Sequence, residues 1–338
     1  MLPLETAWFL LVGLLLAGYA ILDGFDLGVG MLHLFVAKSD GERRQVINSV
    51  GPVWDGNEVW LLAGGGALFA AFPKVYATVF SGLYLALMLV LAALILRAVC
   101  LEFRSKVASP RWRGAWDTTF AVSSFLPSLL FGVAMGNILR GLPLDPEQEF
   151  AGTFFGLLNP FALVVGLLSV AMFLTQGAAW LNVKTEGPVR ARAQAWARGA
   201  WLAFAVLWLV PTLTSRVAIP RLWQAYAHPL AWVAPVLFVI AVAEFRVLVG
   251  GKRPGLAFAH FSVAIAMLFA IMGQGLYPDL VPALGAGESL TVMNASSTPL
   301  TLKVMLAIAL LGMPFVIGYT IFIYSRFKGP VKLDEHSY

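Results

Sequence analysis

Long apolar stretches alternate along this chain with short breaks that are polar or rich in glycine and proline. Each stretch is long enough to cross a bilayer as a helix, which takes about 20 apolar residues. The stretches lie at about 7–36, 49–72, 75–97, 116–139, 159–182, 197–215, 230–249, 255–277 and 303–325. The pattern predicts an all-α polytopic membrane protein with nine transmembrane helices, in which residues 1–338 form a single integral membrane domain.

The composition supports this prediction. Of the 338 residues, 59% are hydrophobic and 12% are charged, about half the charge of a soluble chain. The net charge of +5 is typical of cytoplasmic membrane loops, so no nucleic-acid partner is expected. The single cysteine, Cys100, excludes an internal disulfide and any metal cluster held by several cysteines. Glu5 and no basic residue precede the first apolar stretch, so no cleaved signal peptide is expected.

The basic residues predict an orientation, because Lys and Arg gather in cytoplasmic loops. Eighteen of the 23 lie in the loops after the first, third, fifth and seventh stretches and in the C-terminal tail. The other five are Lys74, Arg140, Arg216, Arg221 and Lys303. We therefore expect the N-terminus outside and the C-terminus in the cytoplasm. With Arg97 assigned to a loop, no basic residue is expected deep in a span, which disfavours a voltage sensor or a Schiff-base pigment.

Four acidic residues fall inside the first two apolar stretches. They form the pairs Asp23 and Asp26, and Asp55 and Glu58. The spacing of three residues places both carboxylates of a pair on one helix face. Two carboxylates close together at low dielectric do not both ionise readily, so one of them can hold a proton near neutrality. The pairs therefore favour a proton relay or a hydrated cavity within the membrane.

A second interpretation of these acids stays open, namely that they only bond to neighbouring helices or to cations of another subunit. Trp54, Asn57 and Trp60 surround the second pair and add hydrogen-bond donors and stacking surfaces. Both interpretations require the acids to face protein or water and not lipid.

The histidines argue against a metal or heme held by this chain alone. His33 and His260 lie near opposite ends of their spans, and His228 and His336 fall in a loop and in the tail. This leaves no facing pair for heme iron, and we expect structural roles for them. The sequence also contains no phosphate-binding loop, nucleophile elbow or zinc-protease motif.

Three ordered segments carry a resemblance to a known family. They are residues 23–31 (DGFDLGVGM), 48–61 (NSVGPVWDGNEVWL) and 65–73 (GGALFAAFP), with shorter matches at 80–84, 104–106 and 294–297. In these segments the chain resembles subunit II of the cytochrome bd quinol oxidases, and the likeness extends from the first span to the last.

The resemblance implies a heterodimer in the bacterial inner membrane that oxidises quinol and reduces dioxygen to water. It implies nine helices arranged as two four-helix bundles plus a peripheral helix. The b- and d-type hemes, with their ligands, are expected on the partner, subunit I. Protons for water formation come from the cytoplasm, which builds proton motive force without a pump. Membrane lipids surround the complex, and a structural quinone or lipid and a small single-helix accessory subunit stay open.

Several residues match positions to which the family assigns roles. Asp55, with Trp54 beside it, matches the acid on the cytoplasmic proton pathway toward the oxygen-reducing heme. Asp23 and Asp26 match first-helix acids implicated in proton transfer or heme-site integrity. Glu58 stands where other members have glutamine, and we keep it as a candidate for the pathway.

Two further residues complete the candidate set. Trp60 matches a tryptophan at the membrane-side mouth of an oxygen channel. Tyr338 matches a final tyrosine that reaches the entrance of the proton pathway.

Two other functions remain as alternatives. Intramembrane acids and broken helices also build proton-coupled secondary transporters, although the odd number of spans and the lack of inverted repeats disfavour one. A purely structural scaffold would use the acids only to pair with a partner's cations.

Overall fold

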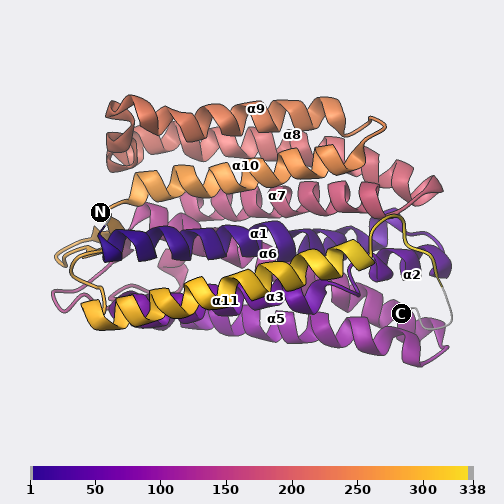
Figure 1. Cartoon of the computed structure of the whole chain (residues 1–338), viewed down its shortest axis with the longest axis horizontal. Coiled ribbons are helices and arrows are strands. Elements are labelled where there is room, and N and C mark those ends of the chain that lie inside the picture. Colours follow the sequence, from indigo (N-terminus) through magenta and orange to yellow (C-terminus); the bar gives the residue numbers. More distant parts are fainter. Residues whose placement is uncertain (1–2, 334–338) are drawn as a thin grey trace.

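The chain forms one elongated bundle of helices that lie side by side (Figure 1). The computed structural model describes residues 3–333. Eight of its helices are long and apolar enough to cross a membrane. They are α1 (Leu4–Val36), α5 (Tyr84–Phe103), α6 (Pro110–Arg140), α7 (Pro160–Lys184), α8 (Gly187–Ala218), α9 (Val233–Leu248), α10 (Pro254–Leu276) and α11 (Pro299–Arg326). A ninth candidate span is α3 (Trp54–Ala71), which continues after a 120° bend into α4 (Pro73–Gly82). The polytopic all-α fold is thus confirmed.

The main departure from the predicted spans lies between residues 49 and 103. A separate short helix, α2 (Asp40–Asn48), precedes α3, and a turn joins the two. Phe72 leaves the helical conformation directly before Pro73, as expected for a residue that precedes proline. The third span consequently starts at Tyr84. The predicted stretch 75–97 was therefore wrong at its start, and Arg97 lies inside α5 instead of in a loop.

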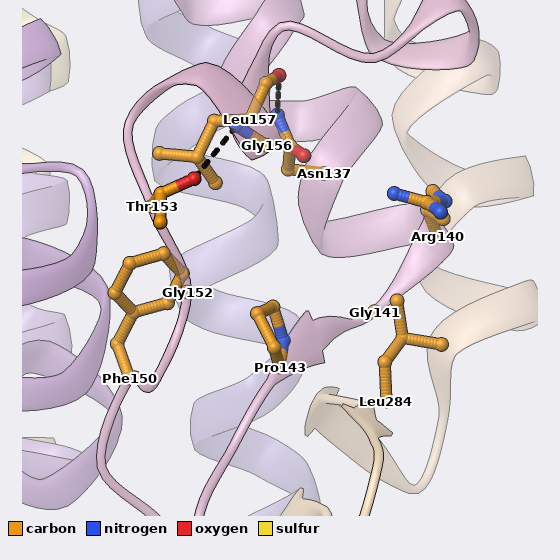
Figure 2. A pocket seen from close by; sticks show the side chains of 10 residues that line it. All are labelled: Asn137, Arg140, Gly141, Pro143, Phe150, Gly152, Thr153, Gly156, Leu157 and Leu284. Atoms are coloured by element: carbon orange, nitrogen blue, oxygen red, sulfur yellow. Dashed lines mark hydrogen bonds between the residues drawn. The ribbon is translucent and has the colours of Figure 1, made fainter.

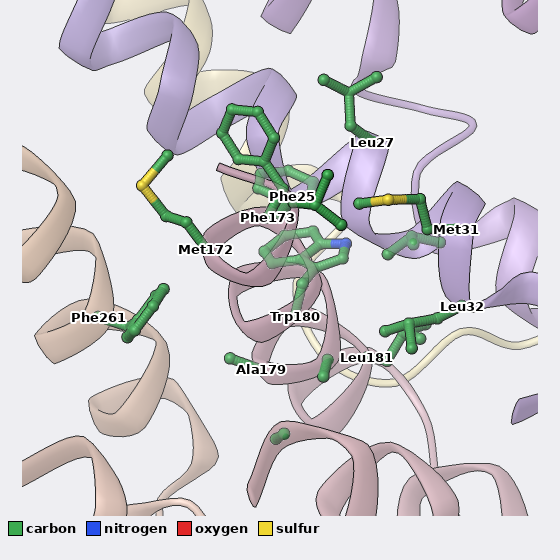
Figure 3. Packing of buried hydrophobic residues seen from close by; sticks show 14 of the residues in the cluster. Phe25, Leu27, Met31, Leu32, Met172, Phe173, Ala179, Trp180, Leu181 and Phe261 are labelled. Atoms are coloured by element: carbon green, nitrogen blue, oxygen red, sulfur yellow. The ribbon is translucent and has the colours of Figure 1, made fainter. Parts of the chain in front are cut away.

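Helix α1 lies at the centre of the bundle and packs against α3, α6, α7 and α10. Glycine allows its backbone to approach α7 closely, since a Cβ atom on Gly28 would lie 1.9 Å from the carbonyl oxygen of Phe173. Beside this crossing, Phe25 stacks on Trp180 with ring centroids 4.3 Å apart, in the apolar packing shown in Figure 3. The acids of α1 therefore lie on a helix that packs against four others.

The two ends of the bundle differ. We call the end that holds α2 the inner end, because the charge pattern assigns it to the cytoplasm, and the opposite end the outer end. Short paired strands lie at the outer end: β1 (Leu142–Pro143) runs parallel to β3 (Ala283–Leu284), and β2 (Asp279–Val281) antiparallel to β4 (Leu290–Thr291). The remaining short elements are 3₁₀ turns, η1 (Arg104–Lys106), η2 (Phe155–Leu157), η3 (Pro220–Ala227) and η4 (Pro229–Trp232).

Helix α11 is peripheral. Within it only Leu302 is buried, and it contacts α1 and α3 along one side of the bundle. It ends at the inner end, whereas α1 starts at the outer end (Figure 1). An odd number of crossings requires this arrangement, in agreement with nine spans. The division of the other helices into two four-helix bundles stays a prediction.

Candidate functional site

A buried arginine joins acids from the first two spans. Arg97 of α5 is 1% exposed, and its Nη1 lies 2.7 Å from Oδ1 of Asp23, which is fully buried on α1. Its Nη2 lies 3.6 Å from Oε2 of the half-buried Glu58 on α3. The expectation that no basic residue lies deep in a span was therefore wrong. Arg97 supplies a positive charge to one acid of each predicted pair, so the pairs are not isolated like charges.

Asp26, one turn after Asp23, is held by an amide instead of a cation. Its Oδ2 accepts a hydrogen bond of 2.8 Å from Nδ2 of Asn57, a buried residue in the first turn of α3. The oxygen of the same amide accepts a hydrogen bond of 2.8 Å from the hydroxyl of Tyr324 on α11. The other carboxylate oxygen of Asp26 is buried without a hydrogen-bond partner in the described part of the chain.

Several more buried polar atoms around these acids lack partners among residues 3–333. They include Oδ2 of Asp23, Nε of Arg97 and the indole N–H of Trp60, whereas the Tyr19 hydroxyl contacts Asp23. Tyr19 lies four residues before Asp23 and therefore on the same face of α1. Buried polar groups are normally satisfied by protein or by ordered water. The unpartnered atoms are therefore groups whose hydrogen bonds ordered water would satisfy.

Asp55 lies in the first turn of α3 and, unlike the other three acids, is exposed on the side of the bundle. It begins a lateral face of α3 that continues through Val59, Leu62 and Phe69, all of them exposed. Trp54 next to it is half-buried and packs against the main core. The structure thus separates the second predicted pair: Glu58 faces Arg97, and Asp55 faces outward.

Trp60 packs against the central helix. A Cβ atom on Gly18 of α1 would lie 2.4 Å from Cε3 of the Trp60 ring, so the glycine leaves the space that the indole fills. Tyr338, the other residue predicted at the periphery of the site, lies outside the described residues.

A second charged cluster, which the sequence analysis missed, closes the inner end. Asp117 of α6 is buried and faces His33 Nε2 at 2.6 Å, Arg104 Nε at 2.5 Å and Arg43 Nη1 at 2.7 Å. Arg104 also pairs with Asp40 at 2.9 Å. These residues come from α1, α2, η1 and α6, so the cluster ties four elements together. The spacing of these residues in the sequence does not predict the cluster, because each charged residue lies near the end of a different apolar stretch.

The short helix α2 is fixed to α8 at the same end. Ser39 and Glu42 form a capping box at its start, and Glu42 Oε1 lies 2.6 Å from Nη2 of Arg192. The hydrogen bond from Arg192, and next the one from the backbone amide of Lys38, hold the pKa of the Glu42 carboxyl below its usual range. The segment that leads into α3 and Asp55 is therefore anchored.

The histidines of the described residues do not form a heme site. His33 is engaged with Asp117, His260 pairs with Glu244 at 2.9 Å on the surface, and His228 accepts a hydrogen bond from the backbone amide of Leu230 in an outer-end loop. They lie on separate elements, each bonded to its own neighbour. No set of three or more His, Cys, Asp or Glu side chains within residues 3–333 is arranged to hold a metal ion.

A cavity of about 220 Å³ opens at the outer end. Its lining includes Asn137, Phe150, Leu157 and Leu284, with Arg140 at its edge (Figure 2). Asn137 is already bonded to the carbonyls of Val133 and Leu157. None of the predicted acids lines this cavity, which separates it from the cluster around Arg97.

Comparison with known proteins agrees with this architecture. Relatives include cytochrome bd-I ubiquinol oxidase subunit 2 of Escherichia coli strain K12, which is 38% identical over 98% of this chain and 96% of the relative. Cytochrome bd ubiquinol oxidase subunit 2 of Bacillus subtilis strain 168 is 36% identical over 99% of each chain. A chain in the structure of bd oxidase from Geobacillus thermodenitrificans shares the fold, with a TM-score of 0.78 over 96% of this chain and 98% of that one, at 19% identity.

The family profile of cytochrome bd terminal oxidase subunit II matches residues 4–327. Together with the relatives, this match confirms the resemblance carried by the segments around Asp23, Asp55 and Phe72. The chain, a multi-pass membrane protein, therefore belongs to the cytochrome bd terminal oxidase subunit II family.

Proposed function

We propose that this chain packs on a heme-bearing subunit I in the bacterial inner membrane and supplies part of the cytoplasmic route by which protons reach the oxygen-reducing heme. The resulting heterodimer oxidises quinol and reduces dioxygen to water. The observation that carries the proposal is the position of Asp55, an exposed carboxylate at the inner end of a membrane helix, beside a buried cluster of acids and Arg97.

The first support is the lateral face of α3. A carboxylate at the centre of a membrane helix costs about 2.5–3.5 kcal/mol, less toward the ends, and such groups face protein or water. Asp55 shares its face with Val59, Leu62 and Phe69, at the spacing of one helix stripe. A partner subunit seated on this stripe would enclose Asp55 between the two proteins, where it can receive protons from the cytoplasmic side.

The second support is the chemistry behind Asp55. Glu58 lies one turn further along α3 and faces Arg97, which also binds Asp23. Carboxylates hold and release protons, and the unpartnered buried atoms around them suit ordered water molecules. We propose that Asp55 receives the proton and that Glu58, Asp23 and Asp26 stabilise and extend the hydrated path. Trp54 shields the path at the inner end of the bundle, and we propose that Tyr338 lies at the entrance of the path.

The resemblance supplies the rest of the proposal. Protons for water formation are taken from the cytoplasm while quinol releases its protons outside, so proton motive force arises without pumping. The b- and d-type hemes bind to subunit I, since the histidines of this chain described here are bonded elsewhere. The N-terminus lies outside and the C-terminus in the cytoplasm.

We also propose that Trp60 borders a route for oxygen. Its ring lies on Gly18, and its indole N–H has no partner within the described chain. Replacing Trp60 by alanine changes the shape of this wall, so we expect Trp60→Ala to alter the apparent oxygen affinity more than the maximal rate. Trp196→Ala, near the start of α8, is the matched control. An oxygen dependence equal to that of the control would count against the route.

The experiment for the proton pathway is oxygen consumption by the purified complex carrying Asp55→Asn. The amide keeps the size and most hydrogen bonding of the carboxylate but removes its titratable proton. Glu147→Gln, in an exposed outer-end loop, is the control for a lost acid elsewhere. A reduced-minus-oxidised heme spectrum of each variant reports assembly, so that a slow proton step is distinguished from a missing heme.

A further inference from the structure

We propose that Tyr324, near the inner end of α11, is a positioning residue for the Asp26 carboxylate and acts through the side chain of Asn57. The inference rests on the proposed function, because it gives the Asp26 carboxylate a defined geometry within the proton path. Neither the composition nor the spacing of the acids pointed to Tyr324.

The contacts form a chain across three helices. The hydroxyl of Tyr324 on α11 donates to Oδ1 of Asn57 on α3 over 2.8 Å. Nδ2 of Asn57 then donates to Oδ2 of Asp26 on α1, also over 2.8 Å, and lies 3.4 Å from the carbonyl oxygen of Leu22. Asn57 and Asp26 are buried. The amide of Asn57 thus links the peripheral helix to the central acid.

In its ionised form, the Asp26 carboxylate fixes the orientation of the Asn57 amide. A carboxylate accepts hydrogen bonds and donates none, so it must face the NH₂ group of Asn57 and not its oxygen. The Tyr324 hydroxyl donates to the oxygen and therefore stabilises that same orientation. Without the hydroxyl, the amide oxygen would be left buried and unsatisfied, which favours a flipped or displaced side chain.

Tyr324 itself is held in place by α7. Its ring meets Trp180 edge to face, with centroids 5.8 Å apart. Trp180 is fixed in turn by its indole N–H, which donates to the Ser49 carbonyl over 2.9 Å. Lys184, also on α7, donates to the carbonyl of Phe327, just beyond α11. The inner end of an otherwise exposed helix is therefore clamped where Tyr324 reaches Asn57.

The competing role for Tyr324 is that of an anchor that only keeps α11 against the bundle. An anchor would act on assembly and would not depend on Asn57. A positioning residue acts through the Asn57 amide. The effect of substituting Tyr324 on turnover must therefore vanish when that amide is removed. A double-mutant cycle measures this dependence directly.

The test is oxygen consumption per assembled heme in four complexes: wild type, Tyr324→Phe, Asn57→Leu and the double variant. We expect Tyr324→Phe to slow turnover about threefold to tenfold in the wild-type background, the range set by one buried hydrogen bond. In the Asn57→Leu background the same change should alter turnover less than about twofold. Tyr319→Phe is the matched control, because Tyr319 lies on the same helix and is 60% exposed.

Two results would overturn the inference. One is unchanged turnover in Tyr324→Phe, and the other is an equal fractional loss in both backgrounds. Normalising to assembled heme keeps the comparison valid where a variant lowers the yield. Asp26→Asn is measured in parallel: if it leaves turnover intact, the proton path through Asp26 fails, whereas slow Asp26→Asn with normal Tyr324→Phe contradicts only the role of Tyr324.

Discussion

Arg97 determines the charge balance of the buried site at the scale of single residues. Its guanidinium faces Asp23 and Glu58 inside the bundle. Burial of either charge alone is unfavourable by several kcal/mol, whereas a well-placed pair offsets that cost. The cluster therefore depends on keeping cation and acid together more than on the presence of either one.

This dependence predicts an asymmetric response to substitution. Arg97→Gln leaves Asp23 buried without its cation, and we expect a loss of about 3–5 kcal/mol of stability. The double variant Asp23→Asn/Arg97→Gln removes both charges and should recover part of that loss. Thermal unfolding of the purified complex measures both variants. A double variant that melts at or below the midpoint of Arg97→Gln would show that charge pairing is not what stabilises the cluster.

The acids themselves could be predicted from the sequence, but their partners could not. Asp23, Asp26 and Asp55 are conspicuous because they interrupt apolar stretches. Arg97 ends an apolar stretch, so its depth depends on where that helix starts. Asn57 was expected to add hydrogen-bond donors near the second acid pair, but its bonds to Asp26 and Tyr324 appear only when α1, α3 and α11 meet.

At the scale of elements, one proline changes the register of a whole span. Pro73 begins α4 after the 120° bend, and the first eight residues of the third apolar stretch, 75–82, are used in this short helix. A hydropathy pattern records that these residues are apolar, but it carries no information about the direction of the chain. The other predicted spans differ from their helices mainly by extensions at the ends, which are polar turns of the same helices.

The crossing of α1 and α7 gives the element-scale prediction. A Cβ atom on Gly28 would lie 1.9 Å from the Phe173 carbonyl oxygen, and backbone atoms cannot move aside as a flexible side chain can. Gly28→Ala should therefore destabilise the complex by at least about 1–3 kcal/mol, the usual cost of overpacking. Gly13→Ala is the control on the same helix, because a Cβ there meets nothing within 4 Å.

The two alanine variants are compared by the melting midpoint and the yield of the purified complex. We expect Gly13→Ala to match or exceed the wild type, since alanine is the better helix former. If Gly28→Ala melted like Gly13→Ala, the close approach of α1 and α7 would not be required for the fold.

At the scale of the whole molecule, polar groups lie in a few places within an apolar bundle. One is the Arg97 cluster, and another is the Asp117 cluster at the inner end. The number of crossings followed from hydrophobicity alone, because the bilayer fixes the length of each helix. Which side chains meet inside the bundle did not follow, because that depends on helix rotation and on glycine contacts such as Gly28 with Phe173.

The lateral face of α3 is the surface of the molecule that suggests a missing partner. Asp55 lies on a surface that would otherwise face lipid, and the family to which the chain belongs consists of second subunits. The proposed complex with a heme-bearing subunit explains both facts, and it makes Asp55 the residue whose substitution tests the proton path most directly.

The most direct test is the rate of oxygen consumption per heme in the Asp55→Asn complex, compared with wild type and Glu147→Gln. We expect the rate to fall at least about tenfold with the heme spectrum unchanged, because a group that transfers protons contributes about 10²–10⁴-fold. Glu147→Gln should behave as the wild type. Wild-type turnover in Asp55→Asn would contradict the proton path, and loss of the hemes with normal turnover of those that remain would make Asp55 structural.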